Sequence, residues 1–241
     1  MTGVSTAGQI LSSLVADDRD PHSLPERLCR ECQSVLPIDG VGLALMNDAG
    51  HQGVIAATDG PATLMEDLQF TLGEGPCMDA SRERRPVLQP DLARTASSRW
   101  PEFGPAVLSA GISAIFAFPL QIGAIRLGIL DLYRATPGTL DAIQLADALA
   151  YADAAVSILL ALQGTMAAGQ GLHEQIGHPL ESRAEIHQAT GVVSVQAVIG
   201  VTEALVLLRA HAYAVDQPIL KIARKVLAGR LRFDSETDDH E

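Results

Sequence analysis

The 241-residue sequence contains 29 acidic and 17 basic residues, which gives a formal net charge of −12 at pH 7. This charge disfavours non-specific binding to DNA or to anionic membranes, so any contact with nucleic acid has to be local. Three cysteines do not make a disulfide framework and are typical of a reducing compartment.

Two helices are predicted at the start of the chain, from Gly8 to Leu14 and from Pro25 to Leu36. The second contains Cys29 and Cys32, whose C-x-x-C spacing occurs in redox pairs and in zinc sites. No second pair follows at metal-site spacing. We therefore expect Cys32 to be a core residue, Cys29 to be incidental and no metal to be bound.

Two strands are predicted next, over residues 38–46 and 53–58, joined by a turn at residues 47–50. A short helix at residues 61–68 precedes the run GEGPC, which ends at Cys77. The glycines and proline of this run predict a tight loop before a helix at residues 77–84. A cysteine at a helix N-terminus has a lowered pKa, so Cys77 is the best-placed reactive thiol. The alternative is a small buried residue that closes the loop against a sheet.

The following segment is predicted to contain a short strand at residues 86–89 and a polar loop at residues 91–98. A helix from Arg99 to Gly111 comes next. Residues 113–121 and 125–133 then form two strands around a tight turn. Asp131 is a charged residue within the second of these apolar strands, and we expect it at the edge of a cavity.

A long Ala/Leu-rich helix is predicted over residues 139–163, with Thr139 as its N-cap. One heptad seam runs along it, formed by Leu145, Leu149, Ala152, Val156 and Leu159. Such a seam fits either a helix packed on its own sheet or a homodimer interface, and one helix can serve both. We expect a homodimer formed through this helix and the C-terminal helices.

Targeting signals are not apparent. The N-terminus has no basic start, and Asp147 and Asp153 interrupt the most apolar run. We therefore expect a cytoplasmic protein without membrane contact.

Paired strands separated by short helices, with a helix at each end, predict an α+β fold in which helices flank an antiparallel sheet. The GEGPC run, the Trp100-Pro101 helix and the hairpin FPLQIGAIRLGILDLY resemble the GAF domain over residues 8–163. That resemblance implies a sensor with a small-molecule pocket between the sheet and its covering helices. The candidate pocket residues are Cys77, Met78, Trp100, Phe103, Phe116, Phe118 and Asp131.

A glycine-rich linker over residues 164–177 leads to three predicted helices within residues 178–233, and an acidic tail follows at residues 234–241. Breaks at Gly200 and Pro218 separate these helices. The last helix carries both lysines of the chain, and residues 217–232 contain five basic residues and no acidic one. This reversal of charge indicates contact with a polyanion, although cations at a solvated helix C-terminus give the same pattern.

The order of small residues in this segment resembles the ANTAR domain, an all-α RNA-binding module of three helices. The matching positions are Gln188-Ala189-Thr190-Gly191, Glu203-Ala204, Leu208-Arg209, Ala212 and Ala223. The family implies binding to RNA hairpins in nascent transcripts, which prevents formation of a terminator. Thr190, Leu205 and Gly200 depart from the residues common in that family. The predicted phosphate contacts are Lys221, Arg224, Lys225 and Arg232, with Arg209 and Arg230 as weaker candidates.

Two other classes of function compete with an RNA-binding regulator. Some GAF domains reduce free methionine sulfoxide with pocket cysteines, and the basic helix also suits an acidic protein surface. We expect neither catalytic residues nor a cofactor, because no Ser/His/Asp set or carboxylate pair stands out in the sequence.

Overall fold

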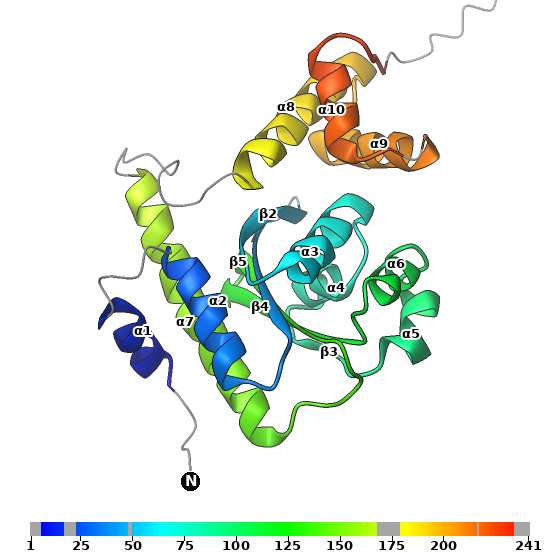
Figure 1. The fold of residues 1–241 in the computed structure, drawn as a ribbon. Helices are drawn as coiled ribbons and strands as arrows, with labels where there is room; N and C mark the ends of the chain where they lie inside the picture. The colour runs from blue at the N-terminus through cyan, green and yellow to red at the C-terminus, as the bar shows by residue number, and fades with distance from the viewer. Residues whose placement is uncertain (1–5, 17–22, 48–49, 168–178, 216, 234–241) are drawn as a thin grey trace, which may run out of the picture. The chain divides into compact units, whose positions relative to one another are not determined.

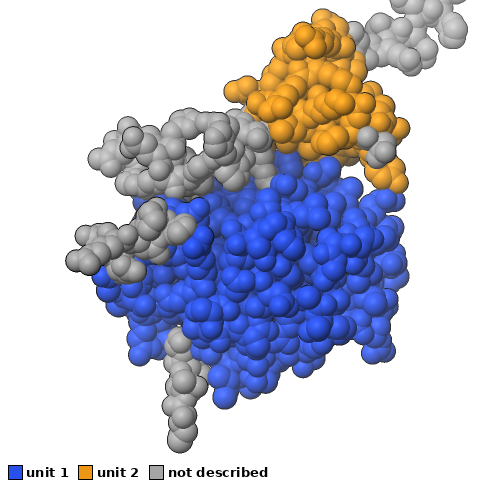
Figure 2. Space-filling model, in the orientation of Figure 1, with its two compact units in different colours: residues 1–177 blue, residues 178–241 orange. Residues whose placement is uncertain are grey.

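The computed structural model describes residues 6–16, 23–47, 50–167, 179–215 and 217–233. The chain forms two compact units, over residues 1–177 and 178–241 (Figure 2). Much of the predicted linker, the predicted acidic tail and the centre of the turn at residues 47–50 lie outside the described residues.

A five-stranded sheet forms the centre of the first unit (Figure 1). Its strands are β1 (Gly40–Asn47), β2 (Gly50–Ala57), β3 (Val87–Gln89), β4 (Ala114–Ile122) and β5 (Ile125–Arg134). The spatial order is β2-β1-β5-β4-β3, and each neighbouring pair is antiparallel. The predicted antiparallel sheet is therefore confirmed.

Helices cover both faces of this sheet (Figure 1). One face carries α2 (Leu24–Val35) and α7 (Ala142–Ala167), and α1 (Ala7–Ala16) packs on both of them. The other face carries α3 (Gly60–Leu72) and α4 (Pro76–Glu83), while α6 (Phe103–Ser109) packs on α3 and on α5 (Leu92–Arg99). Each face of the sheet is therefore part of a separate buried layer.

The alternation of side chains along β4 divides its residues between the two layers. Ile115 and Ala117 belong to the buried cluster beneath α3 and α4. Phe116 and Phe118 are equally buried but point to the opposite face, where the Arg134 guanidinium lies 5.6 Å from the Phe116 ring. The prediction that these two aromatic residues line the same pocket as Cys77 is therefore wrong.

Two predicted boundaries are also wrong. Residues 92–99 form a helix instead of a polar loop, because Leu92 and Ala96 bury one side of it against the core. The N-terminus of α7 is capped by Asp141, whose Oδ1 accepts from the backbone N–H groups of Ile143 and Gln144 at 2.9 Å each. Thr139 does not serve as this cap.

The part of α7 over Ala142–Leu162 is the one described helix that is long and apolar enough on its own to cross a membrane. The bent pair Glu185–Ala197 and Val201–Ala214 meets the same criterion only when the two helices are taken together. The expectation that Asp147 and Asp153 break the apolar run was therefore wrong. In the first unit α7 lies on β4 and β5, and Ala148, Tyr151 and Ile158 are buried.

The described part of the second unit contains three helices, as predicted: α8 (Pro179–Ala197), α9 (Val201–Ala214) and α10 (Ile219–Leu227). All three pack on one another. Their shared core consists of Ile186, Ala189, Val193, Ala204, Leu205, Leu208, Ala212, Ile219, Ile222, Ala223 and Val226. Small residues at several of these positions allow the helix backbones to approach closely.

Val198 follows α8 with a positive φ of 56° and a side chain that is 82% exposed. A left-handed conformation is unfavourable for a β-branched residue, whereas asparagine adopts it readily. We expect Val198→Asn to stabilise the second unit by about 1 kcal/mol. Thermal unfolding of the full chain, followed by circular dichroism, measures this. A lower midpoint for the variant would contradict the assigned backbone conformation.

Candidate functional site

A cluster of buried polar groups lies between α3 and the sheet. It comprises His51 of β2, Glu66 and Gln69 of α3, Asp131 of β5 and the backbone N–H of Cys77 in α4. None of these four polar side chains is more than 1% exposed. Buried polar groups are costly unless they are hydrogen-bonded, so the connections between them determine what this site can do.

Gln69 joins three elements through its side-chain amide. Its Nε2 donates to Asp131 Oδ2 at 2.8 Å, and its Oε1 accepts from the Cys77 N–H at 2.8 Å. One side chain of α3 therefore holds both a central strand and the first turn of α4.

Glu66 and Asp131 are two buried acidic side chains that lie close together, because Glu66 packs against Gly42 of β1 and Gly42 is the partner of Asp131 in the pairing of β1 with β5. Glu66 Oε2 lies 3.2 Å from His51 Nε2. Burial raises the pKa of Asp131 well above its usual range, the Glu66 charge raises it further, and the Gln69 hydrogen bond lowers it. The site therefore favours a protonated carboxyl.

Two glycines leave the space that these side chains occupy. A Cβ built on Gly42 would lie 2.2 Å from Glu66 Oε1. A Cβ on Gly75 would lie 2.7 Å from Gln69 Oε1, and this glycine has a φ of 122°, which other residues rarely adopt. A side chain at either position would therefore collide with the polar cluster.

The rest of the GEGPC run has structural roles. Glu74 Oε2 accepts from the backbone N–H groups of Glu102 and Phe103 at 3.1 and 3.2 Å, which caps the start of α6. The Cys77 side chain is fully buried, and burial raises its pKa well above the usual thiol value. The expectation of a lowered thiol pKa at this helix N-terminus is wrong, because desolvation outweighs the helix.

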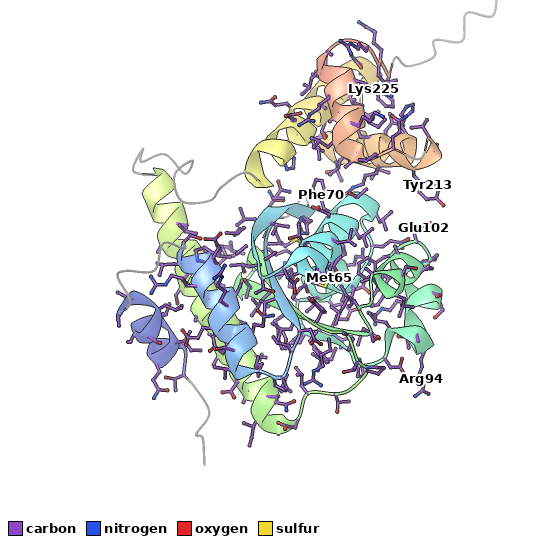
Figure 3. All side chains as sticks on the ribbon, in the orientation of Figure 1. Met65, Phe70, Arg94, Glu102, Tyr213 and Lys225 are labelled. Atoms are coloured by element: carbon purple, nitrogen blue, oxygen red, sulfur yellow. The ribbon has the colours of Figure 1, made fainter. Side chains whose placement is uncertain are left out.

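Cys77, Trp100 and Phe103 of the predicted pocket lie in one buried cluster, and Met78 packs against it. Met65 of α3 belongs to the same cluster (Figure 3). Asp131 is joined to this region through Gln69. His51, Glu66 and Gln69 were missed by the sequence analysis. The available signal was two polar residues, Glu66 and Gln69, three positions apart in a helix whose same face carries Ala62 and Met65.

Cys29 and Cys32 are buried on α2, and both are free thiols. Burial is the main cause of a raised pKa for each of them. Their helix packs on β1 and β2 from the face opposite α3 and α4. Within the described ranges, no group of three or more His, Cys, Asp and Glu side chains is arranged to hold a metal ion.

The basic residues of α10 lie opposite its buried apolar face. Lys221 is exposed, and Lys225 Nζ donates to Gln217 Oε1 at 2.8 Å (Figure 3). Arg224 is 60% exposed but forms an ion pair with Glu185 of α8, at 2.6 Å from Nε and 3.3 Å from Nη2. This pair lowers the pKa of Glu185 and raises that of Arg224. Within the described residues, Arg224 is therefore paired with a carboxylate and neither lysine is.

The remaining predicted RNA contacts lie off α10. This helix ends at Leu227, so Arg230 and Arg232 are in the segment that follows it. That segment packs against α8 and α9. The Phe233 N–H donates to Gln196 Oε1 at 3.1 Å, and the centres of the Phe233 and His211 rings are 5.2 Å apart. Arg209 is partly buried on α9. The suggestion that Arg232 extends the face of α10 is wrong.

The first unit is similar to proteins of a known family. The family model described as GAF domain matches residues 18–159. A domain assigned to a two-component sensor histidine kinase protein from Sinorhizobium meliloti 1021 aligns with a TM-score of 0.50 and 22% identity, over 61% of this chain and 96% of that one. The GAF domain of a phosphoenolpyruvate-protein phosphotransferase from Acinetobacter also gives 0.50, at 9% identity, over 69% and 99%. No curated protein matches the sequence.

Proposed function

The chain belongs to the GAF domain family, which matches residues 18–159, and from this premise we propose that it is a regulator with an RNA-binding output. In this proposal the GAF domain is the sensor, and the C-terminal helices form an ANTAR-type unit that binds hairpins in nascent transcripts. The observation that carries it is α10. This helix buries one apolar face in the three-helix core and directs Lys221 and Lys225 away from that core.

The position of these lysines suits a phosphate backbone. They are four residues apart, which is one helical turn or about 6 Å. They are also the only two lysines in a chain of net charge −12, so the rest of the molecule disfavours non-specific attraction of nucleic acid. The neighbouring Arg224 joins such a contact only when its pair with Glu185 opens.

Charge reversal at both lysines tests the proposal. We expect Lys221→Glu with Lys225→Glu to weaken binding of the full chain to a paired-hairpin RNA by at least about tenfold. The slope of log affinity against log salt should become shallower by about 1.5, because two phosphate contacts are lost. Fluorescence anisotropy titrations at several salt concentrations measure both quantities.

A matched control carries the same change of charge elsewhere. Arg30 of α2 and Arg94 of α5 are exposed residues of the first unit (Figure 3 labels Arg94). The variant Arg30→Glu with Arg94→Glu should bind the hairpin with nearly wild-type affinity. Equal losses in the two double variants would refute α10 as the contact and point to net charge alone.

The redox alternative is less well supported. A reactive cysteine needs an accessible thiol with a lowered pKa. Cys29, Cys32 and Cys77 are each buried, and burial raises the pKa of all three.

A further inference from the structure

Two carboxyl groups in one buried site are the least expected feature of the first unit. We infer that Glu66 and Asp131 form a carboxylic acid–carboxylate pair that holds one proton inside the GAF core, and that loss of this proton loosens α3 from the sheet. The inference goes beyond the proposed function, because it assigns to the sensor domain a binding site for a proton.

The surroundings of Asp131 favour a shared proton. Asp131 Oδ2 accepts from Gln69 Nε2, whereas Asp131 Oδ1 receives no N–H donor from the described residues. The neighbouring acidic group is the Glu66 carboxyl, which packs against Gly42, the strand partner of Asp131. Two ionised carboxylates repel each other in a buried site, so the pair favours a single proton held by one of the two. Neither lysine nor arginine neutralises Asp131 within the described part of the chain.

The groups around the pair come from every element packed against it. His51 faces Glu66 from β2, and Gln69 faces Asp131 from α3. The Cys77 thiol and the Asp79 carboxylate lie on α4, and Asp79 is bonded to Arg99 Nε at 2.8 Å. The Tyr133 hydroxyl of β5 donates to Asp59 instead. Burial raises the pKa of the Cys29 thiol on α2, and the Glu66 charge raises it further. His51 brings its imidazole within 3.2 Å of the Glu66 carboxyl.

Loss of the proton affects the contact between α3 and β5. Glu66 belongs to α3 and Asp131 to β5, so repulsion between two buried carboxylates pushes this helix away from the sheet. Gln69 transmits the same displacement to the start of α4, because it also holds the Cys77 N–H. A higher pH thus weakens the packing of α3 and α4 on one face of the sheet.

The direction of the pH dependence follows from linkage. A carboxyl whose folded pKa is raised binds its proton more tightly in the native state than in the unfolded chain, where the pKa is about 4. The stability that this proton contributes is therefore fully present below the unfolded pKa of about 4, and it is lost as the pH rises toward the folded pKa. We expect the midpoint of thermal unfolding to fall by about 3 °C per pH unit over this range from the pair alone.

Asp131→Asn tests the inference in the full-length protein. The new amide can accept from Gln69 and donate permanently to Glu66, so it replaces the proton. We expect the variant to melt several degrees above wild type at pH 8 and the difference to close as the pH approaches 5. The same comparison in a His51→Gln background removes the imidazole titration. Asp147→Asn, at a buried aspartate on the other face of the sheet, serves as the control and should not show this pattern.

A second measurement is made first on the wild-type protein, where its decisive result does not depend on the folding of a variant. Infrared spectra of wild-type protein at pH 7 should contain the carbonyl stretch of a protonated carboxylic acid, and the band should disappear in Asp131→Asn or in Glu66→Gln. Absence of the band in wild type would overturn the inference. So would a variant Asp131→Asn that is less stable than wild type at every pH. Neither readout involves RNA, so failure here leaves the RNA proposal standing.

Discussion

Ile222→Asp is expected to unfold the C-terminal helical unit and leave the GAF domain intact. Ile222 is fully buried in the face of α10 that packs on α8 and α9. A carboxylate there has no partner and leaves a gap in the core, at a combined cost of about 4 kcal/mol or more. A unit of this size has little stability in reserve, so this cost exceeds what the three helices can absorb.

Separate signals report the two units. The protein has one tryptophan, Trp100, which lies in the buried cluster of the GAF domain. We expect the helical circular-dichroism signal of Ile222→Asp to fall while tryptophan fluorescence and its denaturation midpoint stay unchanged. Val206→Asp, at a residue of α9 that is 57% exposed, provides the matched control and should behave as wild type. Loss of both signals together would contradict independent folding of the units.

Gln69→Leu is expected to destabilise the GAF domain by about 3 kcal/mol or more. The substitution keeps most of the side-chain volume but removes the donor to Asp131 Oδ2 and the acceptor of the Cys77 N–H. Each buried group left without its partner costs about 1–3 kcal/mol. Chemical denaturation followed by Trp100 fluorescence measures the change in the free energy of unfolding.

The matched control is Gln121→Leu. The amide of Gln121 donates to the carbonyl of Arg84 at 3.3 Å on the surface, where water can replace the lost bond. This variant should change the free energy of unfolding by less than about 0.5 kcal/mol. Similar losses for Gln69→Leu and Gln121→Leu would show that the buried amide does not connect α3, α4 and β5 as described.

Local patterns in the sequence were sufficient for much of the fold. Alternating apolar residues located the long strands, and the breaks at Gly200 and Pro218 located the three C-terminal helices. The helix over residues 92–99 was missed because most of its residues are polar. Its two buried residues, Leu92 and Ala96, are recognised as one apolar face only in the folded structure. Such a short helix is specified mainly by what it packs against.

The candidate site depended on contacts between distant residues. Gln69 and Asp131 are 62 positions apart, and no local pattern links them. Strand register decides that Asp131 points toward α3, and the same alternation removes Phe116 and Phe118 from that face. In the second unit the pair of Arg224 with Glu185 joins residues 39 positions apart. The spacing of residues along the last helix groups Arg224 with the two lysines, but it cannot reveal a partner on another helix.

Sequencing of the RNA that co-purifies with the full-length protein from its native cells tests the central claim most directly. We predict that wild-type protein retains transcripts enriched in paired hairpins, and that Lys221→Glu with Lys225→Glu loses them while Arg30→Glu with Arg94→Glu keeps them. Recovery of no RNA above the level of the lysine variant would contradict it.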